Sequence, residues 1–268
     1  MRVAVAQGCR QLLHDCQREL VAELRESSRV CHDGACTTRS TRAGRHAHTP
    51  PIVRFLALLL APALLAGLAL STGWLPFKLG VPGLCALILM GILQRCPAGR
   101  RREIWSVITA FGLSMVGDYF LSSRRGQAHF FEAGIAAFFV AHLGYLRYSL
   151  LNGSLHRLAL AVLMVVFVPY FVLALSPAIQ GGVLWVAVLL YLLISCIGLA
   201  AAVGLKQPSV VRGFYVAGIG LVVFSDTIIS FNEFLHYRAL NAWILPTYYL
   251  AHLTITTSIL LRPDLRRS

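Results

Sequence analysis

The chain has 268 residues, of which 57% are hydrophobic and only 13% are charged. A soluble domain of this length cannot bury so much apolar side chain, so the composition excludes an ordinary soluble fold and indicates a protein that lies in lipid. The formal net charge of +13 does not indicate a nucleic-acid partner, because the basic residues form short runs between apolar segments rather than a basic, aromatic-bearing domain.

The first 50 residues form a polar, arginine-rich segment without the apolar stretch of a secretory signal. We predict a disordered cytosolic tail over residues 1–50, with at most a short helix around residues 11–25. Four of the seven cysteines lie in this tail, and an odd total implies no complete disulfide framework. The spacing of the tail cysteines and histidines fits no standard zinc finger, so we expect no metal and no other cofactor.

Residues 51–268 are expected to form one all-α domain, a polytopic membrane protein with eight transmembrane helices. Crossing a hydrocarbon core of roughly 30 Å takes about 20 mostly apolar helical residues. Eight such runs occur, at residues 52–73, 76–94, 104–122, 128–148, 157–176, 182–204, 213–233 and 241–261. Turn signals separate them, among them the Arg100–Arg102 run, Asn152-Gly153 and Gly181-Gly182.

The basic residues are distributed unevenly between the two sides of these helices. They concentrate in the tail and in the even-numbered loops, whereas the odd-numbered loops and their flanks carry only Lys78, Arg124, Arg125 and Arg238. Because short cytosolic loops are enriched in Lys and Arg, we predict that both termini are cytosolic. The excess of arginine over lysine favours a bacterial inner membrane, with the endoplasmic reticulum as the eukaryotic alternative.

The two halves of the domain share a short internal repeat. Gly112-Leu113 precedes Asp118 as Gly220-Leu221 precedes Asp226, and Ala141-His142-Leu143 resembles Ala251-His252-Leu253. Four predicted helices separate the copies, so the sequence predicts two parallel four-helix repeats related by a pseudo-twofold axis along the membrane normal. Chance similarity between apolar segments is the alternative.

Asp118 and Asp226 are the main candidates for chemistry, because each lies within an apolar helix. An unpaired carboxylate there costs about 2.5–3.5 kcal/mol even on permissive insertion scales. Counting the helical rise from Arg102 and Arg212 puts both at similar depth on the non-cytosolic side, where they can share one cavity. Alternatively, each carboxyl only hydrogen-bonds a neighbouring helix, which stabilises packing by about 0.6 kcal/mol.

Two carboxyl groups in one low-dielectric cavity cannot both ionise cheaply, so one is expected to keep its proton. Such a pair can work as a general acid and a general base. Residues within reach of the same end at helical spacing are Ser114, His129, Glu132, Asn232 and Tyr248. Glu132 is the best candidate for a third acid in the cavity. Alternatively, it is an interfacial carboxylate near Arg124 or Arg125.

His142 and His252 lie deeper in the predicted bundle. They either form part of a polar channel or are packed and hydrogen-bonded between helices. Neither the zinc-protease pattern H-E-x-x-H nor the serine-hydrolase pattern G-x-S-x-G occurs, so neither a metallohydrolase nor a serine esterase is expected. The glycines within the predicted helices indicate close helix packing, namely Gly112, Gly134, Gly144, Gly198, Gly218 and Gly220.

The order and spacing of several motifs resemble the lysoplasmalogenase family of eight-span membrane proteins, also called YhhN-like. The motifs are Gly117-Asp118, then Phe131, Gly134, Phe138, His142 and Tyr145, and in the second half Ser225-Asp226, Phe234 and Thr247-Tyr248-Tyr249-x-Ala251. The resemblance covers approximately residues 52–262. One departure is His252, where the family pattern has glutamine.

The resemblance implies a hydrolase that cleaves the vinyl ether bond of lysoplasmalogens, giving a fatty aldehyde and glycerophosphoethanolamine or glycerophosphocholine. The expected partners are therefore a lysophospholipid substrate and membrane lipid. The candidate catalytic residues are Asp118 and Asp226. The candidate substrate-binding or supporting residues are Ser114, Glu132, His142, Asn232, Tyr248, Tyr249 and His252.

The proposed carboxyl pair also suits a different class of protein. A proton-coupled transporter or channel uses paired intramembrane carboxylates and parallel repeats as well. Pro82 and Pro169 are the clearest of few signals for broken helices, which disfavours transport. A structural scaffold without chemistry would leave two costly aspartates at matching depth unexplained.

Overall fold

The computed structural model describes residues 51–94, 96, 98–124 and 126–263, with side chains described from residue 57 onward. The predicted tail, its short helix and its four cysteines lie outside these residues. Within them the structure is helical, with eight α-helices, α2 (Pro51–Thr72), α3 (Leu75–Leu93), α4 (Ala98–Ser123), α5 (Ala128–Leu151), α6 (Arg157–Tyr170), α7 (Gly182–Val203), α8 (Ser209–Phe234) and α9 (Ile244–Leu260). A π-helical turn, Phe171–Leu175, extends α6, and a 3-10 turn, Asn241–Trp243, precedes α9.

Each predicted apolar segment coincides with one of these helices. The largest difference is at α4, which begins at Ala98, so that Arg100–Arg102 are helical and the turn predicted there is wrong. Hydropathy marks only the apolar part of a helix, and arginine is a good helix former that extends it into the polar region. Pro82 leaves α3 continuous, whereas Pro169 is followed directly by the π-helical turn.

Six helices of the described chain, α3 to α8 with the π-helical turn counted in α6, are long and apolar enough to cross a membrane. In α2, which has 22 residues, the described side chains begin at Ala57, and α9 has 17 residues. Apolar side chains are exposed along these helices, for example Val165, Leu173 and Val183, which are 74%, 78% and 81% exposed. Large apolar side chains facing outward on long apolar helices are expected where lipid is the solvent. The protein is therefore a multi-pass membrane protein.

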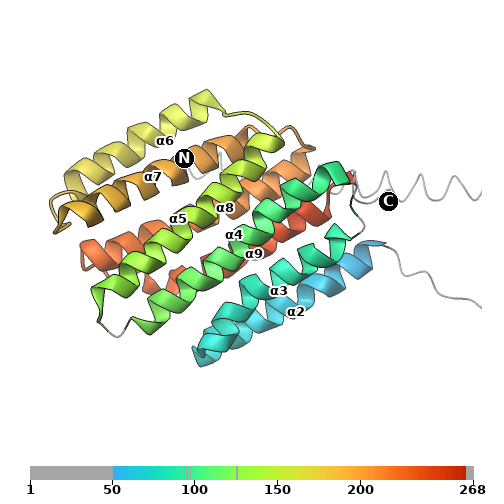
Figure 1. Ribbon diagram of the computed structural model, residues 1–268, viewed down its shortest axis with the longest axis horizontal. Helices are drawn as coiled ribbons and strands as arrows, with labels where there is room; N and C mark the ends of the chain where they lie inside the picture. Colours follow the sequence, from blue (N-terminus) through green and yellow to red (C-terminus); the bar gives the residue numbers. More distant parts are fainter. Residues whose placement is uncertain (1–50, 95, 97, 125, 264–268) are drawn as a thin grey trace, which may run out of the picture. The chain divides into compact units, whose positions relative to one another are not determined.

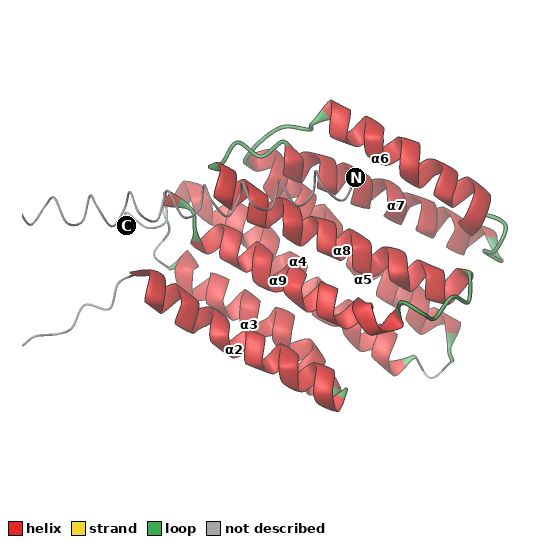
Figure 2. Ribbon diagram, turned by 180° about the vertical axis from the view of Figure 1, so that it is seen from behind, coloured by secondary structure: helices red, strands yellow, loops and turns green. Residues whose placement is uncertain are grey.

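Four helices, α4, α5, α8 and α9, form the centre of the bundle (Figures 1 and 2). The α2–α3 pair packs on one side, against α4 and α9, and the α6–α7 pair packs on the other, with α7 against α5 and α8. Short connections make consecutive helices antiparallel. The α2–α3, α4–α5, α6–α7 and α8–α9 connections consequently share one end of the bundle, which we call the site end (Figure 1).

Glycines allow the central helices to approach closely at three of the six positions where the sequence predicts it. A Cβ atom at Gly144 of α5 would lie 2.7 Å from the Ser106 carbonyl oxygen of α4, and one at Gly218 of α8 would lie 2.5 Å from the Ile255 side chain of α9. Gly134 similarly faces Leu121. The prediction is wrong for Gly112 and Gly198, where an added Cβ atom would have nothing within 4 Å, and at Gly220 an added Cβ would make only an ordinary contact of 3.9 Å with Leu199.

A buried ion pair connects helix ends at the end of the bundle opposite the site end. Arg262, just beyond α9, is fully buried and donates from Nη1 to Glu103 Oε2 at 3.0 Å and to the Tyr148 hydroxyl at 3.2 Å. A buried charge pair is destabilising unless both partners are hydrogen-bonded, as these are. The contacts tie the last described turn of the chain to the beginning of α4.

Candidate functional site

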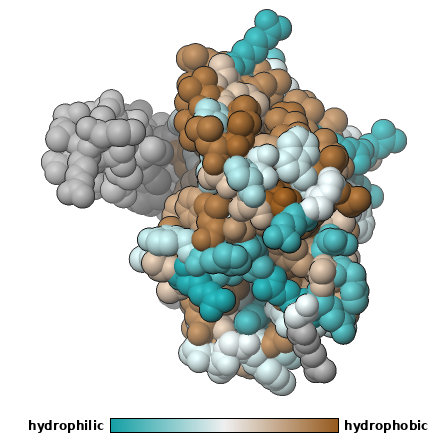
Figure 3. Space-filling view, turned by 90° about the vertical axis from the view of Figure 1, so that its left-hand side faces the viewer, coloured by the Kyte–Doolittle hydropathy of each residue, from teal (hydrophilic) through white to brown (hydrophobic). Residues whose placement is uncertain are grey.

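Asp118 of α4 and Asp226 of α8 line the same cavity, which has a volume of about 270 Å³. Helices α3, α4, α5, α8 and α9 supply its walls. The lining residues are Lys78, Asp118, Leu121, Ser122, Arg124, Phe131, Phe138, Ser225, Asp226, Ile229, Asn232, Glu233, Ile244, Leu245 and Tyr248. Most of them belong to the ends of helices at the site end. Hydrophilic residues gather in the lower middle of this end, and hydrophobic residues cover its upper part (Figure 3).

Asp118 is held by a tyrosine from the last helix. The Tyr248 hydroxyl donates to Asp118 Oδ2 at 2.9 Å. The Tyr248 ring packs edge-on against Phe138 and His252, with ring centroids 6.1 and 4.5 Å away. These rings fix the direction of the hydroxyl, so the carboxyl of Asp118 has a defined orientation at the cavity wall.

Asp226 has two polar partners from other helices. The Tyr191 hydroxyl of α7 donates to Asp226 Oδ2 at 2.8 Å, and His142 Nε2 of α5 lies 3.5 Å from the same oxygen. His142 Nδ1 lies 2.9 Å from the Phe138 carbonyl oxygen, which can only accept, so this nitrogen carries a hydrogen. Nε2 of a neutral ring is then an acceptor, and it makes no hydrogen bond with any described residue. A hydrogen bond between Nε2 and the Asp226 carboxyl requires a proton on one of the two groups.

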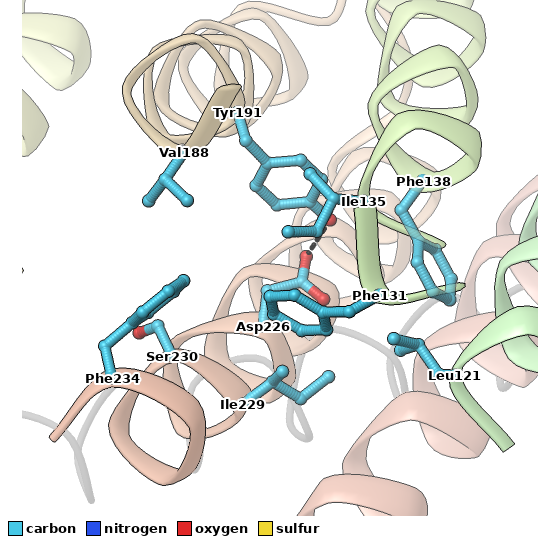
Figure 4. Close-up of a pocket in the computed structure, with 10 residues that line it drawn as sticks. All are labelled: Leu121, Phe131, Ile135, Phe138, Val188, Tyr191, Asp226, Ile229, Ser230 and Phe234. Carbon is cyan, nitrogen blue, oxygen red and sulfur yellow. Dashed lines mark hydrogen bonds between the residues drawn. The ribbon is translucent and has the colours of Figure 1, made fainter. Parts of the chain in front are cut away.

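An apolar pocket adjoins the polar cavity at Asp226 (Figure 4). It is lined by Leu121, Phe131, Ile135, Phe138, Val188, Tyr191, Asp226, Ile229, Ser230 and Phe234, of which five also line the polar cavity. The carboxyl of Asp226, with the Tyr191 hydroxyl bonded to it, lies among these apolar side chains. Asp118 lines the polar cavity but not this pocket. The two aspartates therefore face different surroundings.

Charged and amide side chains surround the opposite part of the cavity. Arg124 donates to Glu233 Oε2 at 2.6 Å, and Asn232 donates to Glu233 Oε1 at 2.8 Å. Asn241 in turn donates to Asn232 Oδ1 at 3.0 Å. The Arg124 guanidinium also lies over the Phe131 ring, 5.5 Å from its centroid. Lys78 of α3 completes the set of charged residues in the cavity wall.

The structure brings several predicted supporting residues to the aspartates. Tyr248 and Asn232 line the cavity, and His142 contacts Asp226. Ser114 is buried below it, where its hydroxyl lies 3.4 Å from the Tyr145 hydroxyl. Tyr249 and His252 are buried in the helix packing, and neither the Tyr249 hydroxyl nor His252 Nε2 has a hydrogen-bond partner among the described residues.

Glu132 and His129 are placed elsewhere. Both side chains are exposed on α5 and neither lines the cavity. The third acid of the cavity is Glu233, and it is also the carboxylate that pairs with Arg124. The helical spacing used in the sequence puts Glu132 at the right height, but its rotation about the α5 axis turns it away from α4 and α8. Glu132 therefore lies at the same end of the bundle as the cavity, but the acid that lines the cavity there is Glu233.

Three residues of the site were missed in the sequence. Tyr191 lies in the middle of an apolar segment, and a single tyrosine there does not by itself indicate a functional residue. Lys78 was used only as a marker of topology, although a lysine at the start of an apolar helix is a polar residue beside the bilayer. Glu233 directly follows Asn232 near the end of α8. An acidic residue next to a predicted site residue was the signal that could have identified it. No group of three His, Cys, Asp or Glu side chains that can hold a metal occurs in the described part of the chain.

Comparison with known families agrees with the motifs. The model of the YhhN family matches residues 77–259, which include every residue of the polar cavity. The chain belongs to the YhhN family. Membership of the YhhN family confirms the resemblance inferred from the order of the aspartate, histidine and tyrosine motifs. No curated protein and no solved structure matches this YhhN chain.

Proposed function

We propose that this YhhN protein hydrolyses the vinyl ether bond of lysoplasmalogens, releasing a fatty aldehyde and a glycerophospho compound, with Asp118 and Asp226 as the acid–base pair. The observation that carries the proposal is that two carboxyl groups from different membrane helices line one cavity, which joins an apolar pocket at Asp226. Intramembrane carboxylates are costly, and such sites mark function.

The surroundings of the two aspartates support an orientation for the substrate. The alkenyl chain fits the apolar pocket beside Asp226, and the glycerophosphate fits the polar cavity beside Asp118. In a vinyl ether R–CH=CH–O–R′, the β-carbon is on the chain side of the bond and the oxygen is on the glycerol side. Asp226, with the proton held between it and His142, is therefore the proposed general acid, and Asp118 the proposed anion.

The reaction then proceeds in three balanced steps. The proton of the His142–Asp226 pair moves to the β-carbon, the carbon–carbon double bond is consumed, and an oxocarbenium ion forms at the carbon bound to oxygen. Asp118 stabilises this cation and removes a proton from the attacking water, which gives a hemiacetal. The hemiacetal collapses as the proton on Asp118 moves to the glycerol oxygen and the hemiacetal hydroxyl returns its proton to the His142–Asp226 pair, which releases the aldehyde and a free glycerol hydroxyl and restores both groups.

The proposal includes the finer architecture expected from the sequence: eight membrane spans, two parallel four-helix repeats and cytosolic termini. The helix contacts support the repeats, because α3 packs on α4 and α9 as α7 packs on α8 and α5. The two repeat histidines also behave alike. His142 Nδ1 and His252 Nδ1 each lie 2.9 Å from the carbonyl oxygen four residues earlier. In this topology the cavity opens on the non-cytosolic side.

Proton-coupled transport is a second candidate, favoured by the π-helical turn after Pro169. Such irregular turns often occur at functional sites, and broken helices are common in transporters. The turn's last residue, Leu175, lines an apolar pocket that also contains Asp226.

One experiment separates the two candidates. The purified protein would be reconstituted in liposomes and assayed for aldehyde release from a 1-alkenyl lysophospholipid, with the matching 1-acyl lysophospholipid as control and proton flux recorded in parallel. We expect aldehyde from the alkenyl lipid, no fatty acid from the acyl lipid and no flux. Proton flux without aldehyde release would contradict hydrolysis and support transport.

A further inference from the structure

The polar cavity holds two cationic side chains that the acid–base chemistry does not use. Lys78 and Arg124 line the same cavity as Asp118 and Asp226. We propose that they form a subsite for a phosphodiester monoanion, the headgroup phosphate of the lysophospholipid. The identity of the lipid rests on the proposed function, whereas the subsite itself follows from the charges in the cavity.

Lys78 is half-buried in the cavity wall at the start of α3. In the described part of the chain, no hydrogen bond or salt bridge at bonding distance engages its ammonium group. Its charge acts on the Asp118 carboxyl through space without a bond. An anion placed in the cavity would give the ammonium a charge-assisted hydrogen bond. The neighbouring Asp118 is directed to the Tyr248 hydroxyl instead.

Arg124 is held in place and still has donors for a ligand. Its Nη1 bonds Glu233, and Phe131 supports the guanidinium plane from one side. Asn232 fixes the other oxygen of Glu233. A guanidinium carries five N–H donors in a fixed fork, so one contact with Glu233 leaves others for a phosphate oxygen. A preorganised arginine of this kind binds phosphate with little further loss of side-chain entropy.

The cavity wall has two cationic side chains, Lys78 and Arg124, beside the carboxyl groups of Asp118, Asp226 and Glu233. Glu233 is paired with Arg124. Lys78 has no bonded carboxylate of this kind among the described residues, so it is the cation that a phosphate would engage first. In a glycerophospholipid the phosphate is on the third glycerol carbon and the vinyl ether on the first. A few bonds therefore separate the two groups, and one cavity can hold both.

Binding of non-hydrolysable lipids tests the subsite without requiring turnover. The ligands are a 1-alkyl lysophospholipid and a 1-alkylglycerol, which share the chain and differ in the phosphate headgroup, with inorganic phosphate as a competitor. The variants are Lys78→Met, and Arg124→Gln combined with Glu233→Gln so that no acid is left unpaired. Matched controls are Lys206→Met, at the opposite end, and Arg238→Gln, an exposed residue of the α8–α9 connection.

We expect each cavity variant to bind the lysophospholipid at least about tenfold more weakly, as for loss of a charge-assisted hydrogen bond, and to bind the alkylglycerol as wild type does. The two control variants should bind both lipids as wild type does. Equal weakening toward both lipids, or no preference of wild type for the phospholipid, would overturn the subsite. Binding of inorganic phosphate with no competition by the lysophospholipid would also overturn it, in favour of a free anion. Normal binding without aldehyde release in the hydrolysis assay would refute only the proposed function.

Discussion

Each aspartate accepts a hydrogen bond from a tyrosine, but among the described residues a histidine lies beside only Asp226, with His142 Nε2 3.5 Å from Asp226 Oδ2. The same residue type therefore occurs in two surroundings, one with an imidazole and one without. Division of labour between two carboxyl groups depends on such a difference in surroundings. The identical pattern of Asp118 and Asp226 in the repeat cannot reveal it.

The first prediction concerns the aspartates. Asp118→Asn and Asp226→Asn keep the size and much of the hydrogen bonding of the side chain but remove the titratable proton. General acid–base groups contribute about 10²–10⁴-fold, so each variant should lower aldehyde release at least about 100-fold. The double variant should be little worse than the poorer single one, because members of a coupled unit are not additive. Near-normal turnover in either single variant, at equal folded protein, would leave that carboxyl with a packing role.

A second prediction concerns the tyrosines that orient these carboxyl groups. Tyr191→Phe and Tyr248→Phe each remove one hydroxyl that donates to an aspartate. We expect kcat to fall by about 10-fold or more, as for loss of a hydrogen bond to a charged group, with little change in KM.

The matched control for these variants is Tyr215→Phe. Tyr215 is fully buried and donates to the Tyr145 carbonyl oxygen at 3.0 Å, away from both aspartates. Its loss should lower stability by about 1 kcal/mol and leave kcat of the folded protein unchanged. Equal losses of kcat in all three tyrosine variants would indicate that the hydroxyls act through packing.

At the scale of the helices, close packing of α4 on α5 places Gly117, the neighbour of Asp118, against the Phe138 ring. The third prediction is that Gly144→Ala destabilises the protein by about 1–3 kcal/mol, since the new methyl group would meet the Ser106 carbonyl oxygen, which cannot move without shifting α4. Thermal unfolding in detergent measures the effect.

Gly112→Ala is the control for Gly144→Ala on the partner helix α4. Gly112 has nothing within 4 Å of the added atom. Alanine is the better helix former, so this variant should be neutral or more stable by up to about 1 kcal/mol. If the two variants unfold at the same temperature, the α4–α5 contact does not depend on the missing side chain.

The helices could be predicted from the sequence because lipid requires long apolar segments whose backbone hydrogen bonds are satisfied internally. The rotation of each helix about its own axis could not be predicted. Hydropathy gives the height of a residue along a helix, which sufficed to put Asp118 and Asp226 at one level. The direction in which a side chain points depends on which neighbours pack against it, and α5 is apolar nearly all round. Glu132 and Glu233 show the consequence, since one turns outward and the other into the cavity.

For the whole molecule, the fourth prediction is topological. In a variant that lacks the tail cysteines, single cysteines would replace the exposed residues Arg102, Lys206 and Arg238. We expect a membrane-impermeant thiol reagent to label the Arg238 position from the non-cytosolic side and the other two positions only from the cytosolic side. Labelling of the Lys206 and Arg238 positions from the same side would rule out the proposed orientation of the cavity.

The junction of a polar cavity with an apolar pocket at Asp226 has a consequence for what happens after bond cleavage. Under the proposed reaction, the two fragments differ sharply in solubility. The long-chain aldehyde, a reactive electrophile, already lies on the apolar side and can diffuse into the bilayer, while the water-soluble glycerophosphodiester leaves through the charged opening. Because the fragments depart into different phases, they rarely meet again. Partition of the aldehyde into the bilayer keeps its concentration at the site low, so the reverse reaction is slow.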